Sequence, residues 1–369
     1  MEKTDVLIIG GGIIGAAAAY FLSRDGVDVL LVEKGELGRE ASGATAGTLS
    51  IQNKEEKSLA LAREGVRIWA ELQDEIGEPL EFVRTGGLRV AETEDQVRTL
   101  EKAARRQRKS GLTVDIWDHT RLRKEAAYLS PDIAAASFCP LDSRCNPLKA
   151  VVALAEHASR QGARFRLGEA VEAIASTTAD GFLVTTSRQC YHGTMVLNCT
   201  GVWSRQIFRL LGLDLPVVLS PQQVMVTEQV PPLFSHVISH IQGKLTLKQV
   251  ESGNVVIGGG WEGHGDTARG LKDLEIESLM GNIRYAGRVI PGLNELYLLR
   301  CWIGFEGRTP DRLPLLGSLR SHPQFLTAGC AKGGFTMGPL LAKLAAEFIR
   351  TGKTSIPLDD FDANRFFSG

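Results

Sequence analysis

Three glycines near the start of the chain have the spacing of a phosphate-binding loop. Gly10, Gly12 and Gly15 follow the apolar run Val6–Ile9 and lead into a stretch of small residues, Ala16–Leu22, that we expect to be helical. In such a strand–loop–helix unit the first glycine permits a tight turn and the second lets the backbone approach a pyrophosphate, while the third lets the helix pack against the strand. The N–H groups at the start of the helix then face the phosphates. The pattern predicts a dinucleotide site.

An acidic residue at the end of the next strand completes this pattern. Val29–Val32 is a second apolar run, and Glu33 follows it directly. A carboxylate at this point of the unit accepts hydrogen bonds from a ribose 2′-hydroxyl, and it repels a 2′-phosphate. The sequence therefore predicts an adenine dinucleotide with a free ribose hydroxyl and argues against NADP.

The composition is that of a globular protein without affinity for nucleic acid. The chain has 369 residues, of which 43% are hydrophobic and 23% charged, and its formal net charge is −1, so it is long enough for two lobes and has no basic excess. No C-x-x-C pair occurs, so we expect no metal site. The first expected strand begins within a few residues of Met1, and no apolar run is long enough to span a bilayer. We therefore expect no signal peptide and a cytoplasmic location.

The order of the expected elements indicates a nucleotide-binding domain assembled from separate segments. Small residues dominate 41–48, which suits a loop that passes close to a ligand, and Asn146 with Pro147 marks the start of a helix. Expected helices cover 58–76, 94–110, 147–162, 271–287 and 340–350. Expected strands include 82–90, with a break at 85–87, and 163–167, 171–176, 181–186, 194–199 and 325–328. We expect one domain from residues 1–80, 141–216 and 300–369, and a strand-rich second domain from residues 81–140 and 217–299.

Several motifs along the chain together are more specific than the glycine loop alone. They are Gly10–Gly15 with Glu33, the small residues 41–48, Asp142 with Asn146 and Pro147, and the segments 198–204, 309–314 and 329–339. In these motifs the sequence resembles the D-amino-acid oxidase and glycine oxidase family of FAD enzymes, over essentially its whole length. The resemblance implies an α/β fold of the D-amino-acid oxidase/glutathione reductase-2 type, in which a Rossmann-like FAD-binding domain carries an inserted strand-rich (α+β) substrate domain.

The resemblance also implies which residues hold FAD. Sarcosine oxidase-like proteins attach the flavin through a cysteine seven residues before the motif aspartate, a position that Gly304 occupies here, so we expect non-covalent FAD. The backbone N–H groups of the turn before the last helix, which we expect to start near Pro339, would stabilise the reduced flavin. The expected cofactor-binding residues are Gly10, Gly12, Ile13, Ile14, Gly15, Glu33, Lys34, Ala41, Ser42, Ala46, Gly47, Thr48, Val171, Thr200, Gly201, Lys332, Gly333, Gly334, Phe335 and Thr336.

The expected substrate-binding residues depart from the family pattern. Glycine oxidase-like chains bind the substrate carboxylate with an arginine five residues before the motif aspartate, where this chain has Glu306 before Asp311. A second family arginine corresponds to Lys332. Three interpretations stay open: Arg308 or Arg300 binds the carboxylate, Glu306 receives a cationic part of the substrate such as that of an opine or a basic amino acid, or Glu306 merely pairs with Arg308.

The chemistry implied by the resemblance is oxidative deamination of an amino acid or a secondary amine by hydride transfer to flavin N5, with no obligatory side-chain base. The stretch 243–261 is similar to subunits of the multi-component proline, hydroxyproline and opine dehydrogenases, which predicts a hetero-oligomer that passes electrons to a partner subunit or a quinone. The alternatives are an oxygen-using oxidase of the glycine, D-amino-acid or sarcosine type, a non-catalytic flavin-binding subunit, and an NAD-dependent dehydrogenase.

Overall fold

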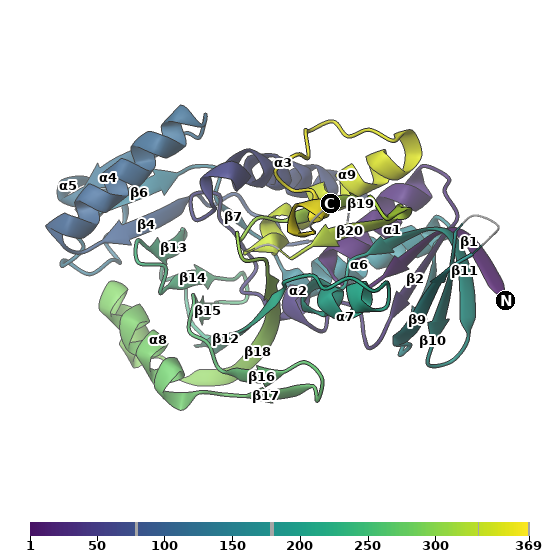
Figure 1. The fold of residues 1–369 in the computed structure, drawn as a ribbon. Helices are drawn as coiled ribbons and strands as arrows, with labels where there is room; N and C mark the ends of the chain where they lie inside the picture. Colours follow the sequence, from purple (N-terminus) through teal and green to yellow (C-terminus); the bar gives the residue numbers. More distant parts are fainter. Residues whose placement is uncertain (78–79, 178–180, 331, 368–369) are drawn as a thin grey trace.

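Two eight-stranded sheets organise the molecule and lie on opposite sides of it in Figure 1. A computed structural model describes residues 1–77, 80–177, 181–330 and 332–367 of the chain. The first sheet has the order β19-β20-β11-β1-β2-β8, with β10 paired to β11 and β9 to β10. Its strands are β1 (Glu2–Ile9), β2 (Val29–Glu33), β8 (Arg164–Leu167), β9 (Val171–Ser176), β10 (Phe182–Thr186), β11 (Cys190–Asn198), β19 (Leu315–Leu319) and β20 (His322–Gly329).

The apolar runs that flank the glycine loop form the centre of this sheet. β1 pairs in parallel with β11 on one side and with β2 on the other. Val6–Ile9 and Val29–Val32 are buried, because a parallel sheet is covered on both faces. The carboxyl ends of β1, β2 and β11 therefore meet at one edge of the sheet, where open α/β sheets bind their ligands.

Four helices pack on this sheet and share one apolar core with it. They are α1 (Ile13–Arg24), α3 (Leu59–Ile76), α6 (Pro147–Arg160) and α9 (Gly334–Thr351). The buried residues of α1 include four consecutive alanines, Ala16–Ala19, whose small side chains let the helix pack closely against its neighbours. The segments 1–76, 147–198 and 315–351, far apart along the chain, thus build one layered unit (Figure 1).

The second sheet has the order β18-β12-β15-β14-β13-β4-β6-β5. Its strands are β4 (Gly87–Ala91), β5 (Asp115–Asp118), β6 (Ala135–Cys139), β12 (Val218–Gln229), β13 (Val237–His240), β14 (Thr246–Gln249), β15 (Asn254–Gly258) and β18 (Leu298–Arg308). The helices that accompany it are α4 (Glu94–Lys109), α5 (His119–Glu125) and α8 (Ile276–Val289). Since β18 pairs with β12 along nearly its whole length, the domain boundary expected at residue 300 falls within a strand of this sheet.

Short elements complete the molecule, and two contacts among them join the two units. The short elements are α2 (Ala41–Ala44), α7 (Ser204–Arg209), the two-stranded sheets β3 (Thr48–Leu49) with β7 (Ser143–Arg144) and β16 (His264–Asp266) with β17 (Leu271–Asp273), and the 3-10 turns at Glu56–Ser58, Gly201–Trp203, Pro291–Glu295 and Ala363–Phe366. The indole N–H of Trp302 on β18 donates to the Ala44 carbonyl (2.8 Å), and Lys272 on β17 pairs with Glu40 (2.7 Å). These contacts hold the second sheet against the edge of the first.

Most of the expected elements are confirmed. The helices expected over 58–76, 94–110 and 147–162 end within two residues of these bounds, and the Asn146 side chain caps α6 as predicted by accepting from the backbone N–H of Leu148. The break expected at 85–87 is confirmed, because Gly86 turns the chain with φ +68° and the strand β4 forms from Gly87 onward. The helix expected from residue 271 begins at Ile276, since the residues before it pair as β17 with β16.

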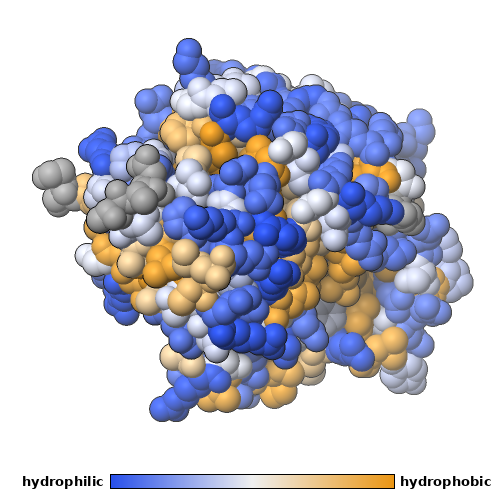
Figure 2. All heavy atoms as spheres, turned by 90° about the vertical axis from the view of Figure 1, so that its right-hand side faces the viewer, coloured by the Kyte–Doolittle hydropathy of each residue, from blue (hydrophilic) through white to orange (hydrophobic). Residues whose placement is uncertain are grey.

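The surface carries both polar and apolar residues. On the face turned to the viewer in Figure 2, hydrophilic residues surround several separate apolar patches. Among the helices of the described ranges, none combines the length and the hydropathy that crossing a bilayer requires.

Candidate functional site

Two of the three glycines in the loop between β1 and α1, Gly10 and Gly15, are required by the local geometry. Gly10 has φ +105°, and a Cβ there would lie 2.8 Å from the carbonyl oxygen of Cys199. A Cβ on Gly15 would overlap the carbonyl oxygen of Gly10, so α1 reaches the strand only because residue 15 has no side chain. Near Gly12 the closest atom to such a Cβ is the Ser42 hydroxyl at 3.0 Å, and the loop is otherwise open on this side.

The start of α1 faces this open side without a negative charge of its own. Gly12 is the N-cap residue, no side chain caps it, and no acidic residue lies in the first turn. The Ile13 N–H donates to the Ser42 hydroxyl at 2.9 Å. Because the first N–H groups of a helix and its dipole favour an anion, this end of α1 is suited to a phosphate group.

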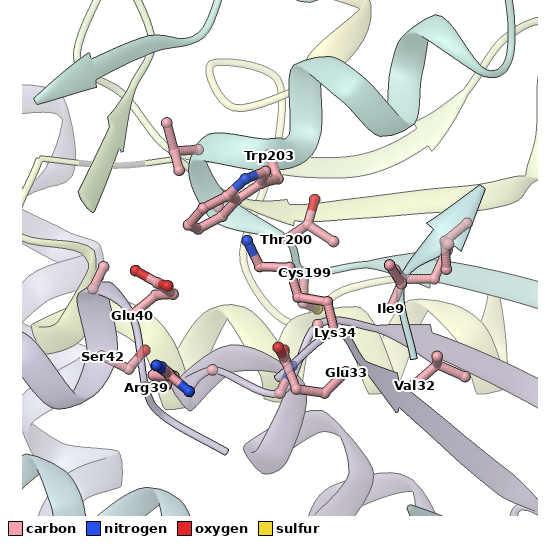
Figure 3. A pocket seen from close by; sticks show the side chains of 18 of the residues that line it. Ile9, Val32, Glu33, Lys34, Arg39, Glu40, Ser42, Cys199, Thr200 and Trp203 are labelled. Atoms are coloured by element: carbon pink, nitrogen blue, oxygen red, sulfur yellow. The ribbon is translucent and has the colours of Figure 1, made fainter. Parts of the chain in front are cut away.

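Glu33 is fixed at the end of β2 by the backbone around it. One carboxylate oxygen accepts from the Gly11 N–H (2.7 Å) and the other from the Gly35 N–H (2.8 Å). Figure 3 places this carboxylate beside the glycine loop, in the wall of a cavity. Each oxygen retains a lone pair, so the group can still accept from a hydroxyl.

Lys34 points away from Glu33, toward the ring of Trp203 (Figure 3). Its Nζ lies 3.1 Å from the centre of that ring, which is a cation–π contact. Burial lowers the pKa of Lys34, against the opposing influence of Glu40 and Glu33. Lys34 and Trp203 thus form one wall of the cavity that Glu33 lines.

Two cavities meet at the glycine loop. The first, of about 170 Å³, runs from the loop past Glu33 to Val171, and the second, of about 810 Å³, extends between the two sheets. Six residues line both: Gly12, Ala41, Ser42, Cys199, Gly201 and Phe305. The two cavities therefore adjoin at the point where the start of α1 favours a phosphate.

The sequence-predicted residues divide between these cavities. The first is lined by Gly10, Gly12, Glu33, Lys34, Ala41, Ser42, Val171, Thr200 and Gly201. The second is lined by Gly12, Ile13, Ile14, Ala41, Ser42, Ala46, Thr48, Gly201, Glu306, Arg308, Lys332, Gly333, Gly334 and Phe335. Gly15, Gly47, Thr336 and Arg300 line neither. Gly15 and Gly47 instead permit close approaches of backbone, since a Cβ on Gly47 would lie 2.5 Å from the Cys145 carbonyl oxygen.

The last helix begins earlier than the sequence predicts. The expected start is near Pro339, but α9 starts at Gly334, after Gly333 with φ +62°, and contains Pro339 in its second turn. A proline there leaves the carbonyl of Phe335 without its usual donor. The buried indole N–H of Trp69 donates to this carbonyl (3.3 Å) and to that of Thr336 (3.2 Å), which compensates for the proline. Ala331, in the turn before the helix, lies outside the described residues.

Glu306 is held by two groups on the wall of the second cavity. One carboxylate oxygen accepts from Arg308 (Nε 2.9 Å, Nη2 2.7 Å), and the other accepts from the backbone N–H of Gly333 at 2.7 Å. Of the three interpretations left open by the sequence, the pairing of Glu306 with Arg308 is the one present in the structure. The carboxylate also holds the residue that caps α9.

The remaining expected substrate residues are placed differently. Lys332 lines the cavity, and burial, together with Arg312 and Arg308, lowers its pKa, against Glu55 and Glu306. Arg300 is exposed at the beginning of β18 and lies outside both cavities, because the strand carries it away from the sheet edge where Glu306 lies.

Three cations of the second cavity were missed by the sequence analysis, and one of them, Lys244, lies before β14 and donates to the Gly260 carbonyl (3.2 Å). Lys54, after the small residues 41–48, and Arg89, on β4, are the other two. Neither belongs to a motif, and only the folding of β4 beside the segment 50–54 brings them to one cavity. Among the described residues, no cluster of His, Cys, Asp and Glu side chains is arranged to hold a metal ion.

Comparisons with known proteins agree with this geometry. The family model described as "FAD dependent oxidoreductase" (DAO) matches residues 5–348. The chain is similar to a subunit of opine oxidase from Rhizobium meliloti, with 25% identity over 377 residues that cover 99% of this chain and 98% of the relative.

Two solved structures share the fold. The crystal structure of glycine oxidase from Geobacillus kaustophilus has a TM-score of 0.92 at 23% identity and covers all of both chains. That of L-proline dehydrogenase from P. horikoshii has a TM-score of 0.90 at 25% identity and covers 99% of this chain and 98% of the other. The expected α/β fold of the glycine oxidase type is thereby confirmed.

Proposed function

The chain belongs to the DAO family of FAD-dependent oxidoreductases, and on this premise we propose that it catalyses the oxidative deamination of an amino acid or a secondary amine and passes the electrons to a partner subunit or a quinone. The observation that carries the proposal is that the two cavities adjoin at the start of α1, where they share six lining residues. A space of this form suits a dinucleotide that has an adenosine at one end and a flavin at the other.

The residues present fit FAD. Glu33 is suited to the ribose, and the uncapped start of α1 to the pyrophosphate. Small side chains at Ala41, Ser42 and Ala46 leave room for a flat ring in the second cavity. At the position of the covalent cysteine of sarcosine oxidase-like proteins, Gly304 faces the Ala44 side chain, where a Cβ would lie only 2.7 Å away, so non-covalent binding is favoured.

When bound, the flavin supplies the acceptor for a hydride, at N5. With the flavin bound, the substrate would lose a hydride from the carbon that bears the amine, while the nitrogen lone pair forms the C=N bond and an N–H proton leaves to solvent. Water would then hydrolyse the imine to a carbonyl compound and ammonia, or an amine if the nitrogen is substituted. The protein's contribution is to orient the substrate in the second cavity and to exclude water from it. An amine that arrives neutral needs no side-chain base.

The electron acceptor is argued from similarity. The opine oxidase relative is, by its name, one subunit of a larger enzyme, and this chain is similar to it over nearly the full length of both. Copurification from the native source tests this part of the proposal, because a dehydrogenase of this type would bring further subunits with it. Rapid reoxidation of the reduced protein by air would instead favour an oxygen-using oxidase.

Anaerobic mixing with D-, L- and N-alkyl amino acids tests the reaction. Purified protein is expected to be yellow and to release FAD on denaturation, and at least one compound of the panel should bleach the flavin band at roughly 450 nm. A protein that binds FAD but is bleached by no member of the panel would be a non-catalytic flavin-binding subunit. A colourless protein that reduces NAD would contradict the proposal.

A further inference from the structure

Lys54 is held rigidly at the wall of the second cavity. The segment before it is anchored by the buried carboxylate of Asp142, which accepts from the Ile51 N–H (2.6 Å), the Ser50 hydroxyl (2.9 Å) and the Gln52 side-chain amide (3.1 Å). The Lys54 N–H closes a turn onto the Ile51 carbonyl at 3.1 Å. The side chain of Lys54 is therefore directed into the cavity by a fixed backbone.

The ammonium group of Lys54 lies against the first residues of α9. A Cβ built on Gly333 would overlap its Nζ, so the two are in direct contact. Gly333 caps a helix of 18 residues, whose N-terminal end carries a positive partial charge. A cation at this end is unfavourable by itself, and a bound anion relieves the repulsion.

The acid with the largest electrostatic influence on Lys54 is already engaged. Both carboxylate oxygens of Glu306 accept hydrogen bonds, from Arg308 and from the Gly333 N–H. Within the ranges that the structure describes, Lys54 forms no ion pair at 4.0 Å or less and donates no side-chain hydrogen bond. Asp142 interacts with it only through longer-range electrostatics.

Positive charge therefore exceeds negative charge around this part of the cavity. Lys54, Arg308 and Lys332 line it together. Two acids, Glu306 and Glu262, line the same cavity, and both pair with Arg308 (2.7 Å and 3.6 Å). Arg89 adds another cation: its Nη1 approaches the Gln52 carbonyl (3.5 Å), and its buried Nε has no hydrogen-bond partner in the described part of the chain. A carboxylate is the group that completes such a cluster, since it accepts charge-assisted hydrogen bonds.

We propose that Lys54 binds the carboxylate of the substrate, so that the enzyme acts on carboxylate-bearing amines, free or N-substituted amino acids, and discriminates against amines without a carboxylate. The inference rests on the proposed function and narrows it. It assigns to the segment after β3 a role that the sequence left to β18 and the turn before α9.

The titration of Lys54 supports this role. Burial lowers its pKa to about 8, against the influence of Glu306 and Asp142, while Lys332 lowers it further. The amine is thus mostly protonated at neutral pH, and its charge is lost as the pH rises through about 8. A carboxylate that binds to the ammonium form must therefore bind more weakly above that pH.

Carboxylate binding to the FAD-loaded protein tests the proposal without turnover. Acetate and its neutral analogue acetamide are titrated while the visible spectrum of the flavin is recorded, in the wild type and in Lys54→Met, Lys54→Arg and Lys57→Met. Lys57 is the matched control, because it is exposed and pairs with Asp360 outside the cavity. We expect Lys54→Met to weaken acetate binding by about 10- to 100-fold, the loss of one charge-assisted hydrogen bond, and Lys57→Met to leave it unchanged.

Two further readouts separate binding from a structural effect. Acetate stays ionised across the alkaline range, so its affinity for the wild type should fall as the pH rises through about 8, whereas Lys54→Arg should bind it without this fall. Lys54→Met should raise the KM for an amino acid from the panel. The KM for the corresponding amine, which lacks the carboxylate, should stay unchanged.

The outcomes distinguish this proposal from the previous one. Acetate that binds Lys54→Met as tightly as the wild type, or that does not bind the wild type at all, overturns the role of Lys54. If no amine bleaches the flavin, the proposed reaction is overturned. The acetate titration still decides whether Lys54 binds a carboxylate, because it requires no turnover.

Discussion

Gly15→Ala is the substitution whose effect follows most directly from the geometry of the dinucleotide site. A normal contact between two non-bonded heavy atoms is roughly 3.5 Å. The added Cβ would lie about 1.6 Å closer than that to the Gly10 carbonyl oxygen. No flexible side chain can move aside, because the Cβ is fixed by its own backbone and the atom it meets is the backbone carbonyl of Gly10. Either α1 moves away from β1, or the loop at Gly10 shifts, and each change displaces the N–H groups that face the phosphate.

The size of the effect follows from the cost of overpacking. Forcing one extra carbon into a closely packed contact costs about 1–3 kcal/mol. The apoprotein can relieve the overlap by moving the loop, but it must return the loop to its original position to bind FAD. The dissociation constant for FAD then rises by about 5- to 150-fold. Alanine is the better helix former by about 1 kcal/mol, so the free energy of unfolding should change less than the affinity.

Titration of the apoprotein with FAD, followed by flavin fluorescence, measures this loss. Gly35→Ala is the matched control, since Gly35 also lies beside Glu33 but a Cβ there has no neighbour closer than 3.7 Å. The Gly35→Ala variant keeps the hydrogen bond from the backbone N–H of residue 35 to Glu33. We expect its dissociation constant for FAD to stay within about twofold of the wild-type value. A folded Gly15→Ala protein that bound FAD as tightly as Gly35→Ala would refute the steric argument.

Three further substitutions test other parts of the structure. Trp69→Phe removes the donor that compensates for Pro339, and urea titration should give a loss of about 1–3 kcal/mol in the free energy of unfolding; an unchanged value would contradict that role. Asn146→Ala removes the cap of α6 and should lower the free energy of unfolding by about 1 kcal/mol in the same assay. An unchanged free energy of unfolding would show that the cap is dispensable. Glu306→Gln should change the ratio of kcat/KM for basic and neutral amino acids by less than about threefold, because Arg308 already engages this carboxylate; a larger fall for basic substrates would restore the view that Glu306 receives a cation.

Local patterns were sufficient to predict the cofactor half of the site. The glycine spacing, the apolar strands around it, the acid at Glu33 and the cap at Asn146 each involve residues close together in the sequence. Their roles follow from backbone geometry, since only glycine fits at Gly10 and Gly15 and the Asn146 side chain accepts from the free backbone N–H groups at the start of α6. Each of these motifs can therefore be recognised from the short segment of sequence that contains it.

The start of α9 shows where such local reasoning ends. Pro339 signals a helix start by itself, but the helix begins earlier, at Gly334, because the indole of Trp69 satisfies the carbonyl that the proline leaves free. Trp69 and Pro339 lie near opposite ends of the chain. A hydrogen bond of this kind leaves no local pattern from which it could have been predicted.

The sequence by itself thus determined the dinucleotide loop, the identity of most helices and strands, and the family. Tertiary structure alone decided how the substrate half is built: β18 joins the second sheet, Glu306 is engaged by Arg308 and Gly333, and Lys54 faces the cavity without a counter-ion among the described residues. The reason is physical. A backbone conformation is specified by neighbouring residues, whereas the charge balance of a cavity depends on side chains that meet only when distant segments have folded together.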